Sequence, residues 1–342
     1  MRALVLDGPG GRSRLAVREL PPPPPPGPGE VLVRIRAAAL NRLDVFMADG
    51  LPGPEPAWPH IVGTDGAGEV EAVGPGVEAP RPGDAVLLDP GIAPAAGDDD
   101  DGPLTPGYRI IGEHRSGTCA ELVVVPARNC WPKPPAMGWA QAAAFPLATL
   151  TAWRMLATRA AVRPGETVLV WGAGGGVAQA SIQVAAHLGA TVIATSGRAA
   201  PLETARRLGA HATIDHATAD VVAEVKRATG GRGADVVVDS VGEQAWPRSL
   251  RCLRRGGRLV ICGATTGPMV QLDLRKLFWH QWTILGSTMG NRREFGAIVA
   301  LAAEGKLWPV VDTVTPLAEG AAAFARLAEG AQAGKVVIEV AA

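Results

Sequence analysis

A glycine-rich loop is the part of this 342-residue chain best suited to chemistry. Residues 172–176 read Gly-Ala-Gly-Gly-Gly, after the β-like run 167–171 and before the apolar segment 177–188. A loop that leads from a strand into a helix allows a tight turn and lets backbone N–H groups approach a pyrophosphate at the helix N-terminus. The pattern therefore predicts dinucleotide binding, and a merely structural loop is the alternative.

The dinucleotide fingerprint can be placed on this loop in two registers. The register with small residues at all three key positions is Ala173, Gly175 and Ala178. The other register ends on a bulky residue and is Gly172, Gly174 and Val177. The loop residues that we expect to bind the cofactor are Ala173, Gly174, Gly175, Gly176 and Val177.

The residues about twenty positions further along indicate which dinucleotide is bound. An NAD site usually has Asp or Glu at the end of its second strand, where it binds the ribose hydroxyls. Residues 194–198 read Ala-Thr-Ser-Gly-Arg and contain no carboxylate. Ser196 can donate to a phosphate and Arg198 can pair with it, so the sequence favours NADP(H). The alternative is that Arg198 is only a solvated surface charge.

The elements that must position this loop alternate between strand and helix. Continuous β-runs separated by helices are typical of a parallel sheet covered on both faces. Six such runs are enough for a complete doubly wound domain. The predicted strands are residues 167–171, 191–195, 211–215, 235–239, 258–262 and 283–286.

The chain before about residue 150 has a different pattern. Short β-like runs bounded by Gly or Pro, such as residues 2–6, predict an irregular, mostly β domain. The last run, 336–340, is expected to return to that domain. We therefore predict an α/β protein in which residues 1–150 and 291–342 form one domain and residues 151–290 form the other.

Composition excludes several classes of function. The 33 basic and 33 acidic residues give no net charge, which argues against nucleic acid or a membrane surface as a partner. No apolar run reaches the ~18 residues that a membrane span needs, and residues 1–10 show no signal-peptide core. The four cysteines lie far apart, which predicts free thiols in a reducing, cytoplasmic environment.

Motifs in order along nearly the whole chain resemble one family. Among them are Asn41-Arg-Leu-Asp, Gly63-Thr-Asp-Gly-Ala-Gly-Glu-Val and Gly334-Lys-Val-Val-Ile. The others are residues 30–35, 73–77, 82–86, 143–153 and 172–178. Together they resemble the medium-chain dehydrogenase/reductase superfamily, nearest its quinone oxidoreductase and zinc-type alcohol dehydrogenase-like branches. The resemblance implies a GroES-like catalytic domain plus a Rossmann domain, with the active site in the cleft between them.

The chain departs from that family at its metal sites. The family's catalytic zinc is held by Cys, by His and by a second Cys or Asp, and the matching positions here are Asn41, Thr64 and Leu147. None of these suits Zn²⁺, and Asp44 and Asp65 alone would make a poor site. The segment that matches the family's structural zinc lobe, residues 91–109, contains no cysteine. No zinc is expected.

The chemistry implied without zinc is hydride delivery to an activated C=C bond. Oxidation of a simple alcohol is harder without a Lewis acid, because nothing stabilises the alkoxide. The resemblance therefore implies a zinc-independent, NADPH-dependent oxidoreductase for a small electrophile of the quinone, enone or enoyl type. Two alternatives stay open: a zinc-type alcohol dehydrogenase or ketone reductase, and a non-catalytic NADPH-binding protein.

The resemblance also assigns catalytic roles to Asn41, Asp44 and Thr64. Asn41 matches a residue beside the nicotinamide, where it would bond a substrate carbonyl or the ribose. Asp44 would orient the same loop or relay a proton. The alternatives are a turn cap for Asn41 and a helix N-cap for Asp44.

Further cofactor contacts are expected from five other residues. Thr151 matches a threonine that contacts the nicotinamide carboxamide, although an ordinary interhelical hydroxyl is the alternative. Lys335 matches a basic residue that reaches the pyrophosphate. Gly242, Cys262 and Gly263 complete the cofactor-binding set.

Residues 282–288 contain the last predicted strand of the parallel sheet and favour self-association. Their sequence, Trp-Thr-Ile-Leu-Gly-Ser-Thr, is apolar and contains no charge. An unpaired edge strand of this kind is an aggregation hazard. In relatives of this type the strand pairs with its symmetry mate, so we expect a homodimer.

Overall fold

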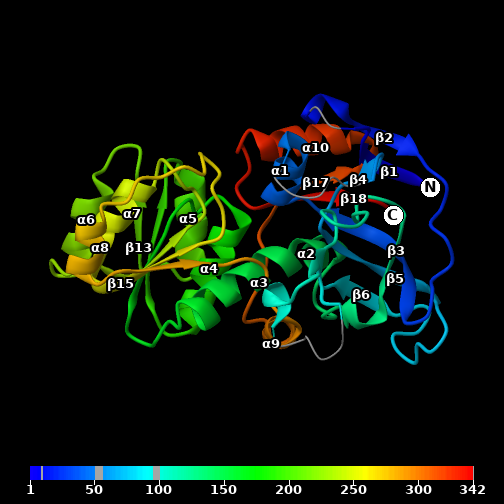
Figure 1. Ribbon diagram of the computed structural model, residues 1–342, viewed down its shortest axis with the longest axis horizontal. Coiled ribbons are helices and arrows are strands. Elements are labelled where there is room, and N and C mark those ends of the chain that lie inside the picture. Colours follow the sequence, from blue (N-terminus) through cyan, green and yellow to red (C-terminus); the bar gives the residue numbers. More distant parts are fainter. Residues whose placement is uncertain (9–10, 51–56, 95–100, 342) are drawn as a thin grey trace. The chain divides into compact units, whose positions relative to one another are not determined.

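The computed structural model describes residues 1–8, 11–50, 57–94 and 101–341 (Figure 1). Its contacts divide the chain into two compact units. The first unit comprises Met1–Ala148 and Gly290–Ala342, and the second comprises Thr149–Met289. Each unit has its own sheets and its own hydrophobic core.

The first unit is built around a seven-stranded, mostly antiparallel sheet. Its strands are β3 (Glu30–Ala39), β5 (Asp65–Val73), β6 (Ala85–Leu88), β9 (Leu122–Pro126), β10 (Cys130–Pro132), β17 (Val311–Pro316) and β18 (Lys335–Glu339). The order is β10-β6-β5-β3-β18-β17, and β9 also pairs with β3. Since β18 pairs with β3, the last strand lies in the first unit, as the sequence predicted.

Smaller sheets and helices complete the first unit. The strands are β1 (Arg2–Leu6), β2 (Leu15–Glu19) and β4 (His60–Ile61), in the order β2-β1-β4, and the pair β7 (Gly91–Ile92) and β8 (Arg109–Ile110). The helices are α1 (Arg42–Asp49), α2 (Trp139–Ala144), α9 (Arg292–Ala303) and α10 (Gly320–Ala328). Because α1 starts three residues after β3 ends, the residues between them are fixed from both sides.

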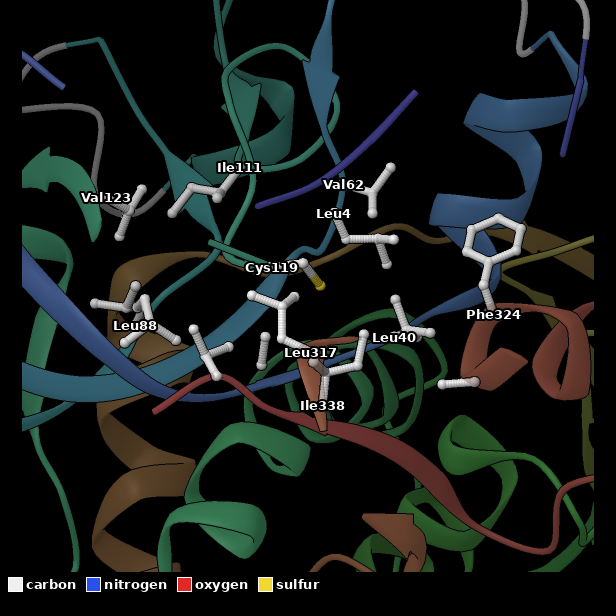
Figure 2. Close-up of a cluster of buried hydrophobic side chains, with 14 of the residues drawn as sticks. Leu4, Leu40, Val62, Leu88, Ile111, Cys119, Val123, Leu317, Phe324 and Ile338 are labelled. Atoms are coloured by element: carbon white, nitrogen blue, oxygen red, sulfur yellow. The ribbon is translucent and has the colours of Figure 1, made fainter. Parts of the chain in front are cut away.

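A core of aliphatic and aromatic side chains holds these strands in place (Figure 2). Leu4, Phe324 and Ile338 are each at most 1% exposed, and Cys119 lies among them as a small apolar side chain. Burial of one such large side chain stabilises a fold by about 1.5–3 kcal/mol. The core therefore gives the ends of β3, β5 and β18 a fixed geometry.

The second unit is one parallel sheet with helices between its strands. The strands are β11 (Thr167–Val170), β12 (Thr191–Ser196), β13 (Ala212–Asp215), β14 (Ala234–Asp239), β15 (Leu253–Ile261) and β16 (Thr283–Gly286). Their order is β13-β12-β11-β14-β15-β16. All of β11 and β14 is buried, as expected for strands covered on both faces. The predicted α/β fold class is confirmed.

The connecting helices also agree with the predicted alternation. They are α3 (Pro146–Trp153) with the π-helical turn Arg154–Arg159, α4 (Gly176–His187), α5 (Ala199–Arg207), α6 (Val221–Ala228), α7 (Trp246–Cys252) and α8 (Leu274–His280). Among the elements that were not predicted are α8 and β17. With seven and six residues, they are too short for a clear hydrophobic period. Nowhere in the described ranges is a helix long and apolar enough to cross a membrane.

Candidate functional site

Three neighbouring strands bring polar side chains together in the first unit. The register pairs Ala39 of β3 with Asp65 of β5 on one side and with Val337 of β18 on the other. Asn41 follows β3 by two residues, and Lys335 is the first residue of β18. The sheet thereby places Asn41 and Lys335 beside the Asp65 carboxylate. We call these three residues the polar cluster.

Asp65 is the centre of the polar cluster. Its Oδ2 accepts hydrogen bonds from Lys335 Nζ at 2.8 Å and from Asn41 Nδ2 at 2.9 Å. Its Oδ1 accepts from the Leu147 N–H at 2.7 Å, and Lys335 Nζ also donates to Asn41 Oδ1. The side chains of Lys335 and Asp65 are 5% and 0% exposed. Loss of either partner would therefore leave a buried charge uncompensated.

Asp44 fixes the two loops that flank the polar cluster. Its Oδ2 accepts from the Asn41 N–H and its Oδ1 from the Gly63 N–H, each at 2.7 Å. The first contact is the capping box of α1, in which Asn41 is the N-cap and Asp44 the third helical residue. Burial raises the pKa of Asp44 to about 6. In this geometry Asp44 holds its neighbours in position, and the helix cap is Asn41 rather than Asp44.

Thr64 lies between these anchored residues and carries an unsatisfied hydroxyl. The residue is fully buried, and its Oγ1 has no hydrogen-bond partner among the described residues. Its neighbours Gly63 and Asp65 are both held through their own contacts. An unpaired buried hydroxyl costs about 1–3 kcal/mol, so it gains free energy when an oxygen acceptor reaches it.

The residues at the positions that match zinc ligands do not fit a zinc ion. Asn41 is bonded to Asp65 and Lys335, Thr64 offers a neutral hydroxyl, and Leu147 offers a backbone N–H. Zn²⁺ is bound by thiolate, imidazole or carboxylate, and the Lys335 ammonium repels a second cation. Across the part of the chain that the structure describes, no group of three or more His, Cys, Asp or Glu side chains could hold a metal ion.

The glycine-rich loop of the second unit joins β11 to α4. Gly172 has a φ of +70°, and Gly175, the N-cap of α4, donates to the Gly172 carbonyl at 3.0 Å. The first turn of α4 contains no acidic residue, so its unpaired N–H groups suit an anion. Apart from the chain neighbours of Gly175, the described atom nearest to a Cβ added there is Gly172 O, at 3.7 Å. The loop is open on this side, as the approach of a pyrophosphate requires.

The structure matches one feature of each of the two registers. The positive φ of the tight turn falls on Gly172, the first position of the second register. The small residue that is buried on α4 is Ala178, at 3% exposure, the last position of the first register. The Ala173 N–H donates to Thr195 O of β12 at 2.8 Å, which ties the loop to the next strand.

The end of β12 provides the groups that would meet a 2′-phosphate. Ser196 is the last residue of the strand and is 5% exposed. Its Oγ accepts from the Arg198 N–H at 3.2 Å, and Arg198 is the exposed N-cap of α5. A hydroxyl, a guanidinium and a helix N-terminus with no carboxylate between them fit a phosphate group.

The remaining predicted cofactor residues lie near the carboxyl ends of the central strands or in α3. Gly242 has a φ of +87°, and a Cβ there would lie 2.6 Å from Gly267 O, so this position requires glycine. Cys262 and Gly263 directly follow β15, and burial raises the pKa of the Cys262 thiol to about 12. Thr151 is buried in α3. Their contacts with a cofactor stay predictions.

Two members of the polar cluster have contacts that the sequence did not anticipate. Lys335 was expected to reach a pyrophosphate, whereas its ammonium contacts Asp65 and Asn41; the pyrophosphate contact stays a prediction. Asp65 was considered only as a poor metal ligand. The available signal was a lysine directly before the apolar strand residues 336–338, because a buried lysine requires an acidic partner.

Comparisons with known proteins agree with this architecture. The profile "Alcohol dehydrogenase GroES-like domain" matches residues 27–135, and "Zinc-binding dehydrogenase" matches residues 176–304. A crotonyl-CoA reductase of Streptomyces collinus is 35% identical over 78% of this chain, which spans 64% of that protein's length. A quinone oxidoreductase of Mus musculus is 28% identical over 99% of this chain and 97% of its own length.

Solved structures are similar over the whole chain. A structure titled NAD-dependent alcohol dehydrogenase is 45% identical, covers 100% of both chains and has a TM-score of 0.96. A cobalt- and zinc-bound alcohol dehydrogenase from Pyrobaculum aerophilum is 36% identical, with 99% coverage of both chains and a TM-score of 0.89. The crotonyl-CoA carboxylase/reductase AntE in complex with NADP is 27% identical, covers 99% of this chain and 95% of its own, and has a TM-score of 0.89.

The parallel sheet and its glycine-rich loop are typical of a dinucleotide-binding domain. The family profiles cover most of the chain, and relatives match it from end to end. The chain therefore belongs to the medium-chain dehydrogenase/reductase superfamily, which confirms the resemblance seen in the sequence.

Proposed function

We propose that this protein is a zinc-independent, NADPH-dependent reductase that delivers hydride to an activated C=C bond of a quinone, enone or enoyl thioester. The observation that carries the proposal is the polar cluster. Where zinc-type relatives place metal ligands, this chain has an amide bonded to a buried lysine–aspartate pair. Two relatives are a crotonyl-CoA reductase and a quinone oxidoreductase, which supports the substrate class.

The second unit supports the choice of NADPH. NADPH, when bound, supplies the hydride. The α4 N-terminus would hold its pyrophosphate, and Ser196 and Arg198 would hold its 2′-phosphate. One similar structure has a title that names NAD, but the carboxylate that usually binds the NAD ribose is missing from residues 194–198 of this chain.

Thr64 is the residue that we assign to the substrate carbonyl oxygen. Negative charge develops on this oxygen when hydride reaches the β-carbon, and a hydroxyl donor stabilises that charge. Asn41 is less suited, because its amide is already bonded to Asp65 and Lys335. We assign Asn41 and Asp44 to holding the loops on either side of Thr64.

A pair of Thr64 variants tests this assignment. Thr64→Val removes the hydroxyl at nearly constant volume and is expected to lower kcat/KM about 10- to 100-fold, the value of one buried hydrogen bond. Thr64→Ser keeps the hydroxyl and should retain most of the rate. Equal losses in both variants would contradict the role of the hydroxyl.

The reaction class is tested with a panel of quinones, enones, enoyl thioesters, ketones and aldehydes. NADPH consumption is followed by absorbance, and the products are identified by mass spectrometry. Saturable reduction of a conjugated C=C bond, with the carbonyl group intact, is the expected result. Turnover of ketones or aldehydes alone would support the competing activity instead.

An alcohol dehydrogenase or ketone reductase is the second candidate. It is favoured by the similar structures whose titles name alcohol dehydrogenases. That function predicts about one zinc ion per chain and loss of activity on chelation. The third candidate, a non-catalytic protein, predicts tight NADPH binding with no turnover of any compound in the panel.

We further propose that the protein is a cytoplasmic homodimer that pairs through β16. This strand is at one edge of the parallel sheet, and Phe278 and Trp279 of the preceding α8 are 68% and 64% exposed. A second copy would pair the open strand edge and cover these rings. The four cysteines are free thiols, which supports a reducing compartment.

Light scattering of two matched variants tests the dimer. Leu285→Lys places a charge in β16 and should give a monomer or aggregate. Val314→Lys places the same charge in β17, an edge strand of the first unit where Val314 is 50% exposed, and should stay dimeric. A wild-type monomer, or dissociation of the Val314 variant alone, would contradict the proposal.

A further inference from the structure

Six consecutive prolines, residues 21–26, connect β2 to β3 in the first unit. This connection runs along the outside of that unit in Figure 1. Proline has a φ near −65°, and a residue before proline is restricted to extended conformations. Within residues 21–26, all of which the structure describes, no peptide bond is cis. The segment is therefore a polyproline II helix of about two turns and roughly 19 Å. We call it the proline run.

The exposure of the proline run repeats with the period of that helix. Every third residue, Pro23 and Pro26, is half-buried, and the other four prolines are exposed. A polyproline II helix has three residues per turn, so residues three apart share one edge. One edge of the helix therefore faces the first unit. The two edges that face solvent consist of Pro21 with Pro24 and of Pro22 with Pro25.

Hydrogen bonds fix the chain on both sides of the proline run. Before it, the Leu20 N–H donates to Met1 O at 2.8 Å. After it, the Glu30 N–H donates to Gly27 O at 3.0 Å, and the Gly27 N–H donates to Glu30 Oε2 at 3.2 Å. A Cβ added to Gly74 would lie 1.9 Å from Gly27 O, so the chain after β5 packs closely against this end. The run is held in one conformation before any partner binds.

The proline run presents apolar rings and carbonyl oxygens and carries no charge. Proline has no N–H, and none of the described donors bonds to a carbonyl oxygen of residues 21–26. Aromatic side chains pack against such rings, and those of Trp and Tyr also donate hydrogen bonds to exposed carbonyls. Grooves lined with aromatic side chains recognise polyproline II segments that have prolines three residues apart.

We propose that the proline run is a docking segment for a partner protein that has an aromatic-lined groove of the SH3 or WW kind. A groove contacts two edges of a three-edged helix, and the third edge points away from it. In this chain the third edge is the one that faces the first unit, so a groove reaches both exposed edges without unfolding of the domain. The run is already ordered, which lowers the entropy that binding costs. This proposal does not depend on the proposed reductase activity.

Calorimetric titration of the full chain with purified SH3 and WW domains tests the proposal. The domains are first selected by their binding to a synthetic peptide of residues 18–29. The folded chain should bind a selected domain at least as tightly as the peptide does, because its run is fixed at both ends. Domains that bind the peptide but not the folded chain would show that the run is inaccessible and overturn the proposal. Failure of every domain to bind the peptide would overturn it as well.

Paired substitutions then identify the edges that the partner contacts. Pro21→Ala with Pro24→Ala removes one exposed edge, and Pro22→Ala with Pro25→Ala removes the other. Each pair should weaken binding about tenfold or more, since the lost rings fill the groove. Pro28→Ala changes an exposed proline of the turn after the run and should bind like wild type.

Unchanged binding in both double variants, or an equal loss in Pro28→Ala, would contradict the assignment of the exposed edges. The Tm of each variant shows whether it is folded. If one double variant does not fold, the other gives the same reading.

Discussion

The polar cluster of the first unit and two loops of the second unit, residues 172–176 and 196–198, use their polar groups in opposite ways. We call these two segments the cofactor loops. In the cluster, Asp65 and Lys335 are 0% and 5% exposed and are bonded to each other. In the cofactor loops, Gly175 is open on one side and Arg198 is exposed. The polar groups of the cluster bond one another without a ligand, whereas the cofactor loops present a helix N-terminus and an exposed guanidinium, which suit an anion. Substitutions in the polar cluster should therefore change stability, and those in the cofactor loops should change cofactor affinity.

Lys335→Met is expected to have the largest effect on stability. It leaves the Asp65 carboxylate buried and unpaired, which should lower the free energy of unfolding by about 3–5 kcal/mol. Denaturant unfolding measures this loss, with the affinity for NADP⁺ determined on the folded fraction.

A double variant sharpens this result. Asp65→Asn removes the negative charge while its amide oxygen can still accept from the Leu147 N–H. The combination with Lys335→Met should be less destabilised than the sum of the single changes, because neither charge remains. Strict additivity would show that the ion pair does not hold the cluster together.

Asp44 should make stability depend on pH below neutrality. Its pKa is raised to about 6 in the folded chain, against about 4 in an unfolded one. The folded state therefore holds its proton more tightly, and stability should fall by roughly 3 kcal/mol as pH rises from 4 to above 6. Unfolding curves over this range for wild type and Asp44→Asn measure the difference.

The variant Asp44→Asn should lose that part of the pH dependence. Asp49→Asn, at the exposed end of the same helix, serves as the control and should keep the wild-type slope. If Asp44→Asn retains the full slope between pH 4 and 6, another group is responsible.

Arg198→Ala should have the smallest effect on stability and a selective effect on binding. Loss of one charge-assisted phosphate contact is expected to weaken NADP⁺ binding about 10- to 100-fold and to leave NAD⁺ binding unchanged. Arg206 on the adjoining helix α5 pairs with exposed Glu203, and Arg206→Ala is the matched control. Equal weakening of both cofactors by Arg198→Ala would show that Arg198 does not discriminate between them.

The glycine-rich loop could be predicted from the sequence because its parts are contiguous. Residues 167–188 contain the strand, the turn and the helix N-terminus in order. The residues expected to bind the 2′-phosphate follow at the end of the next strand. The cluster could not, since Asn41, Asp65 and Lys335 are far apart in sequence and meet only through the register of β3, β5 and β18.

Short elements were also difficult to predict from the sequence. Three apolar side chains of α8, Leu274, Phe278 and Trp279, are exposed, so the helix does not show the one-sided pattern of a packed helix. The early start of β15 at Leu253 was hidden by charged residues and glycines at 254–257.

The most direct test of the central claim measures metal content and activity on the same preparation. Purified protein is analysed for zinc by mass spectrometry, treated with a chelator, dialysed, and assayed with NADPH and a quinone or enone. The account predicts far less than one zinc per chain and an unchanged rate of C=C reduction after chelation. Stoichiometric zinc together with loss of that rate on chelation, restored by added zinc, would contradict it.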